Sequence, residues 1–345
     1  MKKGTKTNLH ALSKKDLEDF LRAHNLPAYR MRQLIHWIYE RSANSLEEIT
    51  EFSKDLRVVL SDKAYLGQLT LLNSQVSADW TEKFLFGLED GESIESVLIP
   101  DARRLTLCIS TQVGCAMDCL FCLTGKLGFK RNLRSHEIVE QVLTVTRSIV
   151  PRKITNIVLM GMGEPLANYD EVIEALWRIV DFMKFSSRRI TLSTVGIIPK
   201  ILELPVRAPE VNLAISLNAT TDEVREHLMP ITKKYPLKAL IDACRRFPLP
   251  RRRRITFEYV LIKDVNDSPE DAKRLIRILK GVPSKINLIP FNPYEGTEFE
   301  RPEDERILIF QEFLRKGDLT ALIRKSKGQD ISAACGQLKG GIMKR

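Results

Sequence analysis

The sequence lacks the apolar runs that insert a protein into a membrane or direct it into the secretory pathway. No stretch of the 345 residues approaches the length needed to span a bilayer. The basic N-terminal stretch 1–7 has no apolar segment behind it, so no signal peptide is predicted. We therefore expect a protein of the reducing cytoplasm that makes no membrane contact.

Cysteine is also scarce, with six residues in the chain. The chain is long and three of these cysteines cluster on one short loop, which is not the pattern of a secreted disulfide framework. A hydrophobic content of 43% and a charged content of 28% are typical of a globular protein. The length predicts one large domain with a smaller one, or two domains.

The three clustered thiols, Cys115, Cys119 and Cys122, give the chain its strongest chemical signal. At this spacing three thiolates can surround one face of a metal centre. A structural zinc site needs a fourth ligand, which His136 could supply, and three buried thiols without metal are a further alternative. A 4Fe–4S cluster usually takes four cysteines, so three leave one iron open to the amino and carboxylate groups of S-adenosylmethionine (SAM). The spacing, with Phe121 before the third cysteine, is similar to that of radical SAM enzymes.

Strands and helices alternate from residue 105 onward. The apolar patterns predict strands at 105–110, 154–160, 189–193, 211–217, 255–262 and 286–290. Helical periodicity occurs at 135–149, 169–182, 221–228, 237–246, 269–279 and 303–314. Such alternation predicts parallel βαβ units with right-handed crossovers. Six units predict an α/β fold in which the strands form an open, partial (β/α)6 barrel.

Two smaller regions precede this barrel. Residues 1–65 predict a helical module, with its third helix at 45–62, that serves either as a structural cap or as an RNA-contacting module. Residues 66–100 predict a short β segment in which Asp90-Gly91 forms a hairpin turn. We therefore expect a helical module, a β linker, and a catalytic core with a cysteine-bearing tail at 101–345.

Small and polar residues follow the predicted strands, at the edge where parallel α/β folds place their active sites. In the loop 160–165, glycines would allow a ligand to approach the backbone closely. Singly, each such residue is an ordinary cap or loop residue, whereas together they predict a polar ring that could hold a cofactor. The other members of this ring are Ser193, Thr194, Ser216, Leu217, Asn218 and Asn292.

The chain carries a net charge of +10 and has a pI of about 9.3. A basic excess of this size favours a polyanionic partner, nucleic acid before membrane. For any single basic residue, a solvated surface position is the alternative. The candidate RNA-contacting residues are Lys126, Lys130, Arg131 and Arg134, which follow the cysteine loop, and the four arginines at 251–254.

Several motifs occur in order along the chain, at 108–115, 115–122, 161–165, 192–194, 214–217, 287–293 and 333–336. Together they resemble the motifs of the RlmN/Cfr family, which are radical SAM adenine methyltransferases of ribosomal RNA. The resemblance covers about 95–341 and is closest to the RlmN branch. One position departs from it, because Asn218 stands where family members commonly have His.

The resemblance implies a mechanism with two thiols. Cys335 takes a methyl group from one SAM, and a second SAM at the open iron is cleaved to a radical that removes hydrogen from this methyl group. The carbon radical adds to the adenine ring, Cys108 resolves the adduct through a transient disulfide with Cys335, and Glu95 accepts a proton. The resemblance implies cofactor contacts at Gly163, Glu164, Ser193, Ser216, Leu217, Asn218 and Asn292.

The implied substrate is an adenosine of 23S rRNA near the peptidyl transferase centre, and in the RlmN branch also the adenosine beside the anticodon of some tRNAs. We expect methylation at C2 by a monomeric enzyme that takes electrons from a donor such as a flavodoxin. One alternative is Cfr-type methylation at C8 of the same adenosine. Another is a non-catalytic, metal-containing RNA-binding protein. Identifying the methylated nucleoside distinguishes C2 from C8 methylation. Anaerobic reconstitution of the metal distinguishes the enzyme from the non-catalytic protein.

Overall fold

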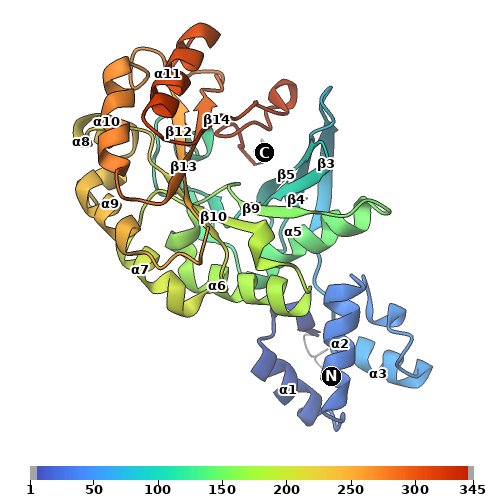
Figure 1. Ribbon diagram of the computed structural model, residues 1–345. Coiled ribbons are helices and arrows are strands. Elements are labelled where there is room, and N and C mark those ends of the chain that lie inside the picture. Colours follow the sequence, from blue (N-terminus) through green and yellow to red (C-terminus); the bar gives the residue numbers. More distant parts are fainter. Residues whose placement is uncertain (1–5, 341–345) are drawn as a thin grey trace.

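The computed structural model describes residues 6–340, and its centre is one mixed sheet of ten strands (Figure 1). The strand order is β14-β13-β12-β11-β10-β9-β6-β5-β4-β3. The parallel part consists of β6 (Arg104–Cys108), β9 (Asn156–Leu159), β10 (Ile190–Thr194), β11 (Asn212–Ser216), β12 (Ile255–Leu261), β13 (Ser284–Pro290) and β14 (Ala321–Ile323). The six predicted strands are all present, which confirms the predicted open barrel of βα units. The short β14 was not predicted, since a run of three residues carries too little periodicity.

Helices cover the outer face of the parallel strands (Figure 1). They are α5 (Ser135–Ser148), α6 (Tyr169–Trp177), α7 (Ile198–Arg207), α8 (Asp222–Leu228), α9 (Leu237–Arg246), α10 (Pro269–Leu279) and α11 (Asp304–Lys316). Only α7 was not predicted, because it contains Pro205 in its interior and buries few apolar side chains. Among the helices of residues 6–340, none combines the length and apolar character needed to cross a membrane.

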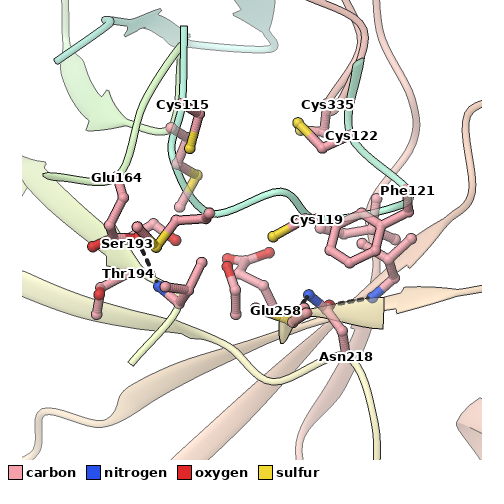
Figure 2. A pocket seen from close by; sticks show the side chains of 18 of the residues that line it. Cys115, Cys119, Phe121, Cys122, Glu164, Ser193, Thr194, Asn218, Glu258 and Cys335 are labelled. Carbon is pink, nitrogen blue, oxygen red and sulfur yellow. Dashed lines mark hydrogen bonds between the residues drawn. The ribbon is translucent and has the colours of Figure 1, made fainter. Parts of the chain in front are cut away.

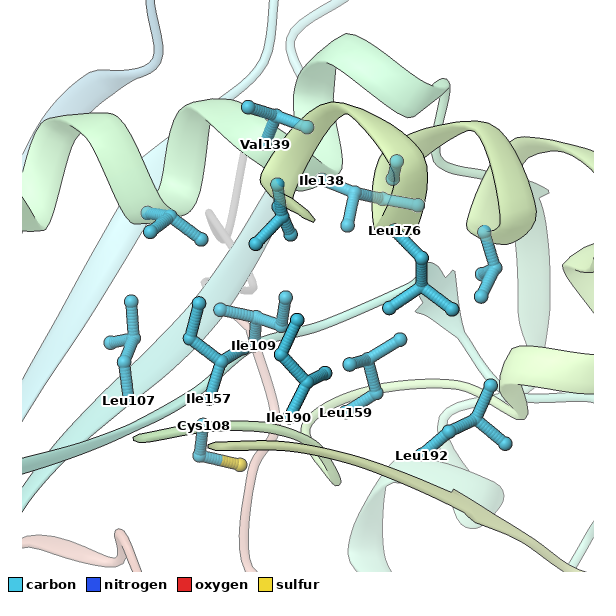
Figure 3. Packing of buried hydrophobic residues seen from close by; sticks show 14 of the residues in the cluster. Leu107, Cys108, Ile109, Ile138, Val139, Ile157, Leu159, Leu176, Ile190 and Leu192 are labelled. Carbon is cyan, nitrogen blue, oxygen red and sulfur yellow. The ribbon is translucent and has the colours of Figure 1, made fainter. Parts of the chain in front are cut away.

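The strands present alternate residues to two different environments (Figure 3). Leu107, Ile157 and Ile190 belong to the buried set that packs beneath α5 and α6. Cys108 follows Leu107, and its side chain points away from these helices. Because side chains alternate along a strand, Ser193 lies on the same inner face. The helices thus fill the outer side of the sheet, and the inner side keeps polar and sulfur-bearing residues.

The β segment at 66–100 extends the central sheet. It contains β3 (Thr70–Val76), β4 (Glu82–Gly87) and β5 (Ser93–Asp101), which pair antiparallel with one another, and β5 pairs antiparallel with β6. The predicted hairpin turn at Asp90-Gly91 joins β4 to β5. The predicted strands of this β segment are present, and they continue the hydrogen-bonded sheet into the barrel.

The N-terminal region is helical, as expected, and packs against α5 and the helical turn Arg178–Phe182 that follows α6. It contains β1 (Thr7–Asn8), α1 (Lys14–Ala23), α2 (Tyr29–Ile35), α3 (Lys54–Lys63) and β2 (Ala64–Tyr65). The predicted third helix is divided into a 3-10 turn and α3, because Ser53 caps α3 at its N-terminus. Buried His10 contacts Glu140 at 2.6 Å, and Arg178 donates a 2.6 Å hydrogen bond to the His10 carbonyl. These polar contacts attach the module to the core.

Candidate active site at the carboxyl ends of the strands

A cavity of about 930 Å³, including the solvent at its mouth, lies at the carboxyl ends of the parallel strands (Figure 2). The sequence predicts the active site at this edge of the sheet. Many of the predicted site residues line the cavity: Cys115, Cys119, Cys122, Gly163, Glu164, Ser193, Ser216, Asn218, Asn292 and Cys335. Leu217, Cys108 and Glu95 are buried and do not belong to its lining.

The cysteine loop lies between β7 (Gln112–Gly114) and α4 (Leu123–Lys126), and β7 pairs with β8 (Phe129–Asn132). Gly114, at φ +74°, begins the loop, and a Cβ atom there would meet the Gly128 carbonyl oxygen at 1.9 Å. Glycine is therefore required at this position. The loop is further fixed by the Leu120 N–H, which donates a 3.0 Å hydrogen bond to the Leu228 carbonyl.

Glu164 braces two of the loops that form the cavity. Its carboxylate accepts hydrogen bonds from the Leu166 N–H at 2.9 Å and from the Val195 N–H at 2.8 Å. Burial raises the pKa of Glu164 to about 7, although hydrogen bonds from the Thr194 hydroxyl and the two backbone N–H groups oppose the rise. Gly163 precedes it at φ +98°, and a Cβ atom there would meet the Gln112 side chain at 2.5 Å. The loop after β9 is thus held close to the loop after β10.

Asn218 ends the polar run that follows β11 and has a left-handed φ of +58°. Its Oδ1 accepts a 2.9 Å hydrogen bond from the Val260 N–H, and its Nδ2 lies 3.3 Å from the sulfur of Met229. Asn tolerates this backbone conformation better than most residues. Leu217 belongs to the main hydrophobic core, so only its backbone can serve the cavity.

Arg225 is fully buried behind the cavity and was not predicted as a site residue. Its guanidinium donates hydrogen bonds to the carbonyls of Leu217 at 3.0 Å, Val195 at 2.6 Å and Ser216 at 3.2 Å. Burial lowers the pKa of Arg225 to about 10, which is still high enough to keep the group charged at neutral pH. One side chain therefore connects the ends of β10 and β11.

We expect Arg225→Met to destabilise the protein by about 3 kcal/mol, because unpaired buried carbonyls cost roughly 1–3 kcal/mol each. Urea unfolding measures the loss of stability. The matched control is Arg245→Met on α9, since Arg245 is half-exposed and pairs with Asp242. Equal stability of the two variants would contradict the bracing role.

Cys335, Cys108, Arg324 and Glu258 form a group of ionisable side chains on the inner face of the sheet. Burial, and then the charge of nearby Cys335, raises the pKa of the Cys108 thiol to about 12. The charges of Cys335, Glu258 and Cys108 raise the pKa of Arg324, Cys335 having the largest effect. Glu258 Oε1 accepts a 3.0 Å hydrogen bond from Asn287, whereas its buried Oε2 has no protein partner. This oxygen can accept a hydrogen bond from a ligand.

Comparison with known protein families identifies the two main regions of the chain. Residues 109–276 match the Radical SAM superfamily, and residues 7–66 match the ribosomal RNA large subunit methyltransferase N-terminal domain. The dual-specificity RNA methyltransferase RlmN of Pelobacter propionicus is 52% identical over 339 residues, which cover 98% of this chain and 97% of that protein. The chain belongs to the RlmN family. RlmN of Geobacter sulfurreducens is 53% identical over 98% of this chain and 93% of its own length.

A solved structure agrees with the RlmN assignment. A radical SAM methyltransferase from Sphaerobacter thermophilus superposes with a TM-score of 0.92 at 43% identity, covering 96% of this chain and 99% of the other. The resemblance stated from the sequence motifs and the predicted fold class are both confirmed. Membership in the radical SAM superfamily implies a 4Fe–4S cluster and SAM as cofactors.

The cysteine loop fits the cluster that RlmN membership implies. Cys115, Cys119 and Cys122 all line the cavity, and burial raises the pKa of each thiol, that of Cys115 to about 12. Iron ions would provide the positive charge that stabilises three thiolates in this cavity. His136, the alternative fourth ligand of a zinc site, does not line the cavity. Within residues 6–340, no three His, Cys, Asp or Glu side chains are arranged to hold a single metal ion.

The disulfide that the RlmN/Cfr resemblance implies is absent from residues 6–340. Cys108 and Cys335 are both free thiols, as are the other four cysteines. The Asn292 side chain donates a 3.3 Å hydrogen bond to the Cys335 carbonyl, so the backbone of the tail is held at the rim while the thiol stays unbonded. A structural disulfide is therefore not a feature of this fold.

Several of the basic residues predicted to contact RNA are paired with carboxylates or lie away from the cavity. Lys130 pairs with Glu92 at 2.7 Å, and Arg131 pairs with Asp90 and Glu137. The arginines at 251–254 precede β12 and therefore lie at the amino ends of the strands, away from the cavity. The charge around the cavity is thus lower than the sequence alone suggests.

Proposed function

We propose that this protein methylates C2 of an adenosine in 23S rRNA, near the peptidyl transferase centre, and of the adenosine beside the anticodon in tRNA. The observation that carries the proposal is that Cys335 lines the same cavity as the three cysteines of the loop. The names of the relatives, which specify dual-specificity RNA methyltransferases, support RNA as the substrate. A net charge of +10 supports the same class of partner.

The chemistry of the target atom explains why direct methyl transfer from SAM is not sufficient. Adenine C2 is electron-poor and is not nucleophilic, so it cannot attack the methyl group of SAM directly. When bound, the cluster and SAM supply the one-electron chemistry that makes a methyl carbon reactive toward such an atom. We assign Cys115, Cys119 and Cys122 to the cluster.

The chain's own residues then have separate tasks. Cys335 carries the methyl group as a thioether, and Cys108 is the second thiol that resolves the adduct. Glu95 accepts the proton that leaves the ring carbon. Two SAM molecules are used per turnover, because one provides the methyl group and the other supports the radical chemistry.

The polar lining of the cavity provides the contacts for SAM. Glu258 Oε2 is a buried acceptor without a protein partner, which suits a ligand hydroxyl or ammonium group. We assign the remaining cofactor contacts to Gly163, Glu164, Ser193, Ser216, the Leu217 backbone, Asn218 and Asn292.

The surroundings of the reaction follow from its chemistry. Six free cysteines suit a reducing cytoplasm, and the one-electron step needs a donor such as a flavodoxin. We propose a monomer in which the helical module at 1–65 docks the RNA, supported by the match of 7–66 to an rRNA methyltransferase N-terminal domain.

The test is the position of the methyl group on RNA treated with the reconstituted protein. We expect 2-methyladenosine by mass spectrometry of digested 23S rRNA and of tRNA. A product containing 8-methyladenosine would instead establish the Cfr-type reaction. A colourless protein that holds zinc and transfers no methyl group would establish the non-catalytic alternative.

A further inference from the structure

The segment that carries Cys335 leaves β14 and crosses toward β5 (Figure 1). The middle of this segment is attached to the start of α4, directly after the cysteine loop, because the Gly336 carbonyl accepts a 2.7 Å hydrogen bond from the Leu123 N–H. The Thr124 hydroxyl donates a 2.6 Å hydrogen bond to the Leu338 carbonyl. These contacts fix the residues just after Cys335. The segment before Cys335 is held by Asp330, whose carboxylate accepts hydrogen bonds from the Ser77 hydroxyl at 2.6 Å and the Ala78 N–H at 3.1 Å.

A buried ion pair adds one attachment on each side of Cys335. Lys83 on β4 and Glu95 on β5 are about 95% buried, at 5% and 4% relative exposure, and their charged atoms lie 3.2 Å apart. Lys83 is paired with Val97 and Glu95 with Leu85 in the β4–β5 register. The two charged residues are therefore diagonal neighbours on one face of the sheet.

The same ion pair contacts the tail on both sides of Cys335. Lys83 Nζ donates a 3.3 Å hydrogen bond to the carbonyl of Ser332, which precedes Cys335. Glu95 Oε2 accepts hydrogen bonds from the N–H groups of Lys339 at 2.8 Å and Gly340 at 3.2 Å, which follow it. The loop from 332 to 340 is thus closed at its base by two side chains of the sheet.

We propose that Lys83 is a positioning residue, which acts through its ion pair with Glu95 to close the loop 332–340 and hold Cys335 in the cavity. The pair is called the tail clamp below. Its role in methyl transfer rests on the proposed function, in which Cys335 carries the methyl group. The clamp itself is a property of the fold.

The tail clamp has a consequence for Glu95. One of its oxygens faces Lys83 and the other accepts two backbone N–H groups. Oε1 keeps one lone-pair site that no contact within residues 6–340 uses, so Glu95 can accept a proton from a substrate base while the tail contacts stay in place.

Amide hydrogen exchange of the reconstituted enzyme without RNA tests the clamp directly. We expect Lys83→Met to accelerate exchange of the Lys339 and Gly340 amides by about tenfold or more. Without Lys83 the negative charge of buried Glu95 is uncompensated, and this favours opening of the contacts that hold the two amides. Lys83→Arg, which keeps the charge, should restore most of the protection. The matched control is Lys238→Met, because Lys238 forms an exposed ion pair with Asp242 on α9.

A second variant keeps the test decisive if Lys83→Met does not fold. Glu95→Gln removes the negative charge from the other side, and we expect the same loss of protection in the tail. Unchanged exchange of the tail amides in the folded variants would overturn the clamp, whatever the protein's activity.

Coupling between SAM cleavage and methyl transfer tests the positioning role. In Lys83→Met we expect more 5′-deoxyadenosine per methylated adenosine, with a lower kcat and a nearly unchanged KM for RNA, and recovery in Lys83→Arg. A purely structural role would lower both products in parallel. If instead the enzyme methylates RNA without the Cys335 thiol, the proposed function fails while the exchange result stands.

Discussion

Cys335→Ala is expected to abolish methyl transfer to RNA while leaving the iron content of the reconstituted protein unchanged. Under the proposed function the thiol is the atom to which the methyl group is bonded, and alanine has no substitute for it. Loss of a covalent nucleophile lowers turnover by at least about a thousandfold. Mass spectrometry of the RNA and iron analysis of the protein provide the two measurements.

The structure indicates why this variant should remain folded. The hydrogen bond from Asn292 is accepted by the Cys335 carbonyl, and the contact with Leu123 is made by the Gly336 carbonyl. These backbone contacts do not depend on the sulfur atom. Cys244→Ala is the matched control, because Cys244 is a buried thiol on α9 that does not line the cavity. Methylated RNA from Cys335→Ala would refute the carrier role.

The predicted parts of the fold are those that depend on patterns of neighbouring residues in the sequence. The strands could be predicted because their helix-covered face is apolar, and the cysteine loop could be predicted from the spacing of its thiols. Polar residues such as Ser193 and Ser216 could be located at the cavity because parallel strands end at one edge. Local sequence was sufficient for these features, since each depends on residues that are near one another in the chain.

The missed features depend on residues that are far apart in the chain. Lys83 contacts Ser332, and Glu95 contacts Lys339, across about 250 positions. Nothing in the sequence near Lys83 indicates that its partner lies in the tail. Arg225 likewise acts on carbonyls of loops that only the folded sheet brings together.

Glu258 lies between the predicted and the missed features, because the sequence contained an indication of its role that was not used. It is the one charged residue of the buried strand β12, and a charged residue in a buried strand is rarely without a partner or a ligand. Arg324 gave no comparable signal, since it follows β14, which was itself too short to predict. Buried charges inside predicted strands are therefore worth treating as site candidates.

Cys119→Ala is expected to prevent assembly of the iron–sulfur cluster. Three cysteines already leave one iron of a 4Fe–4S cluster without a protein ligand, so removing one of them leaves only two anchors. Cys119 is the most buried thiol of the loop, at 7% relative exposure. We expect iron to fall from about four atoms per chain to below about one after anaerobic reconstitution.

The control for this variant is Cys108→Ala, because Cys108 is a buried thiol on the inner face of the sheet that is not assigned to the cluster. It should keep the full iron content and the brown colour while losing methyl transfer. The pair of variants therefore separates the thiols that hold the cofactor from the thiols that act on the methyl group. Full iron retention by Cys119→Ala would contradict the assignment of the cysteine loop to the cluster. Zinc in place of iron in the unsubstituted protein would contradict it as well, because the thiolates of the loop are stabilised by the metal that they bind.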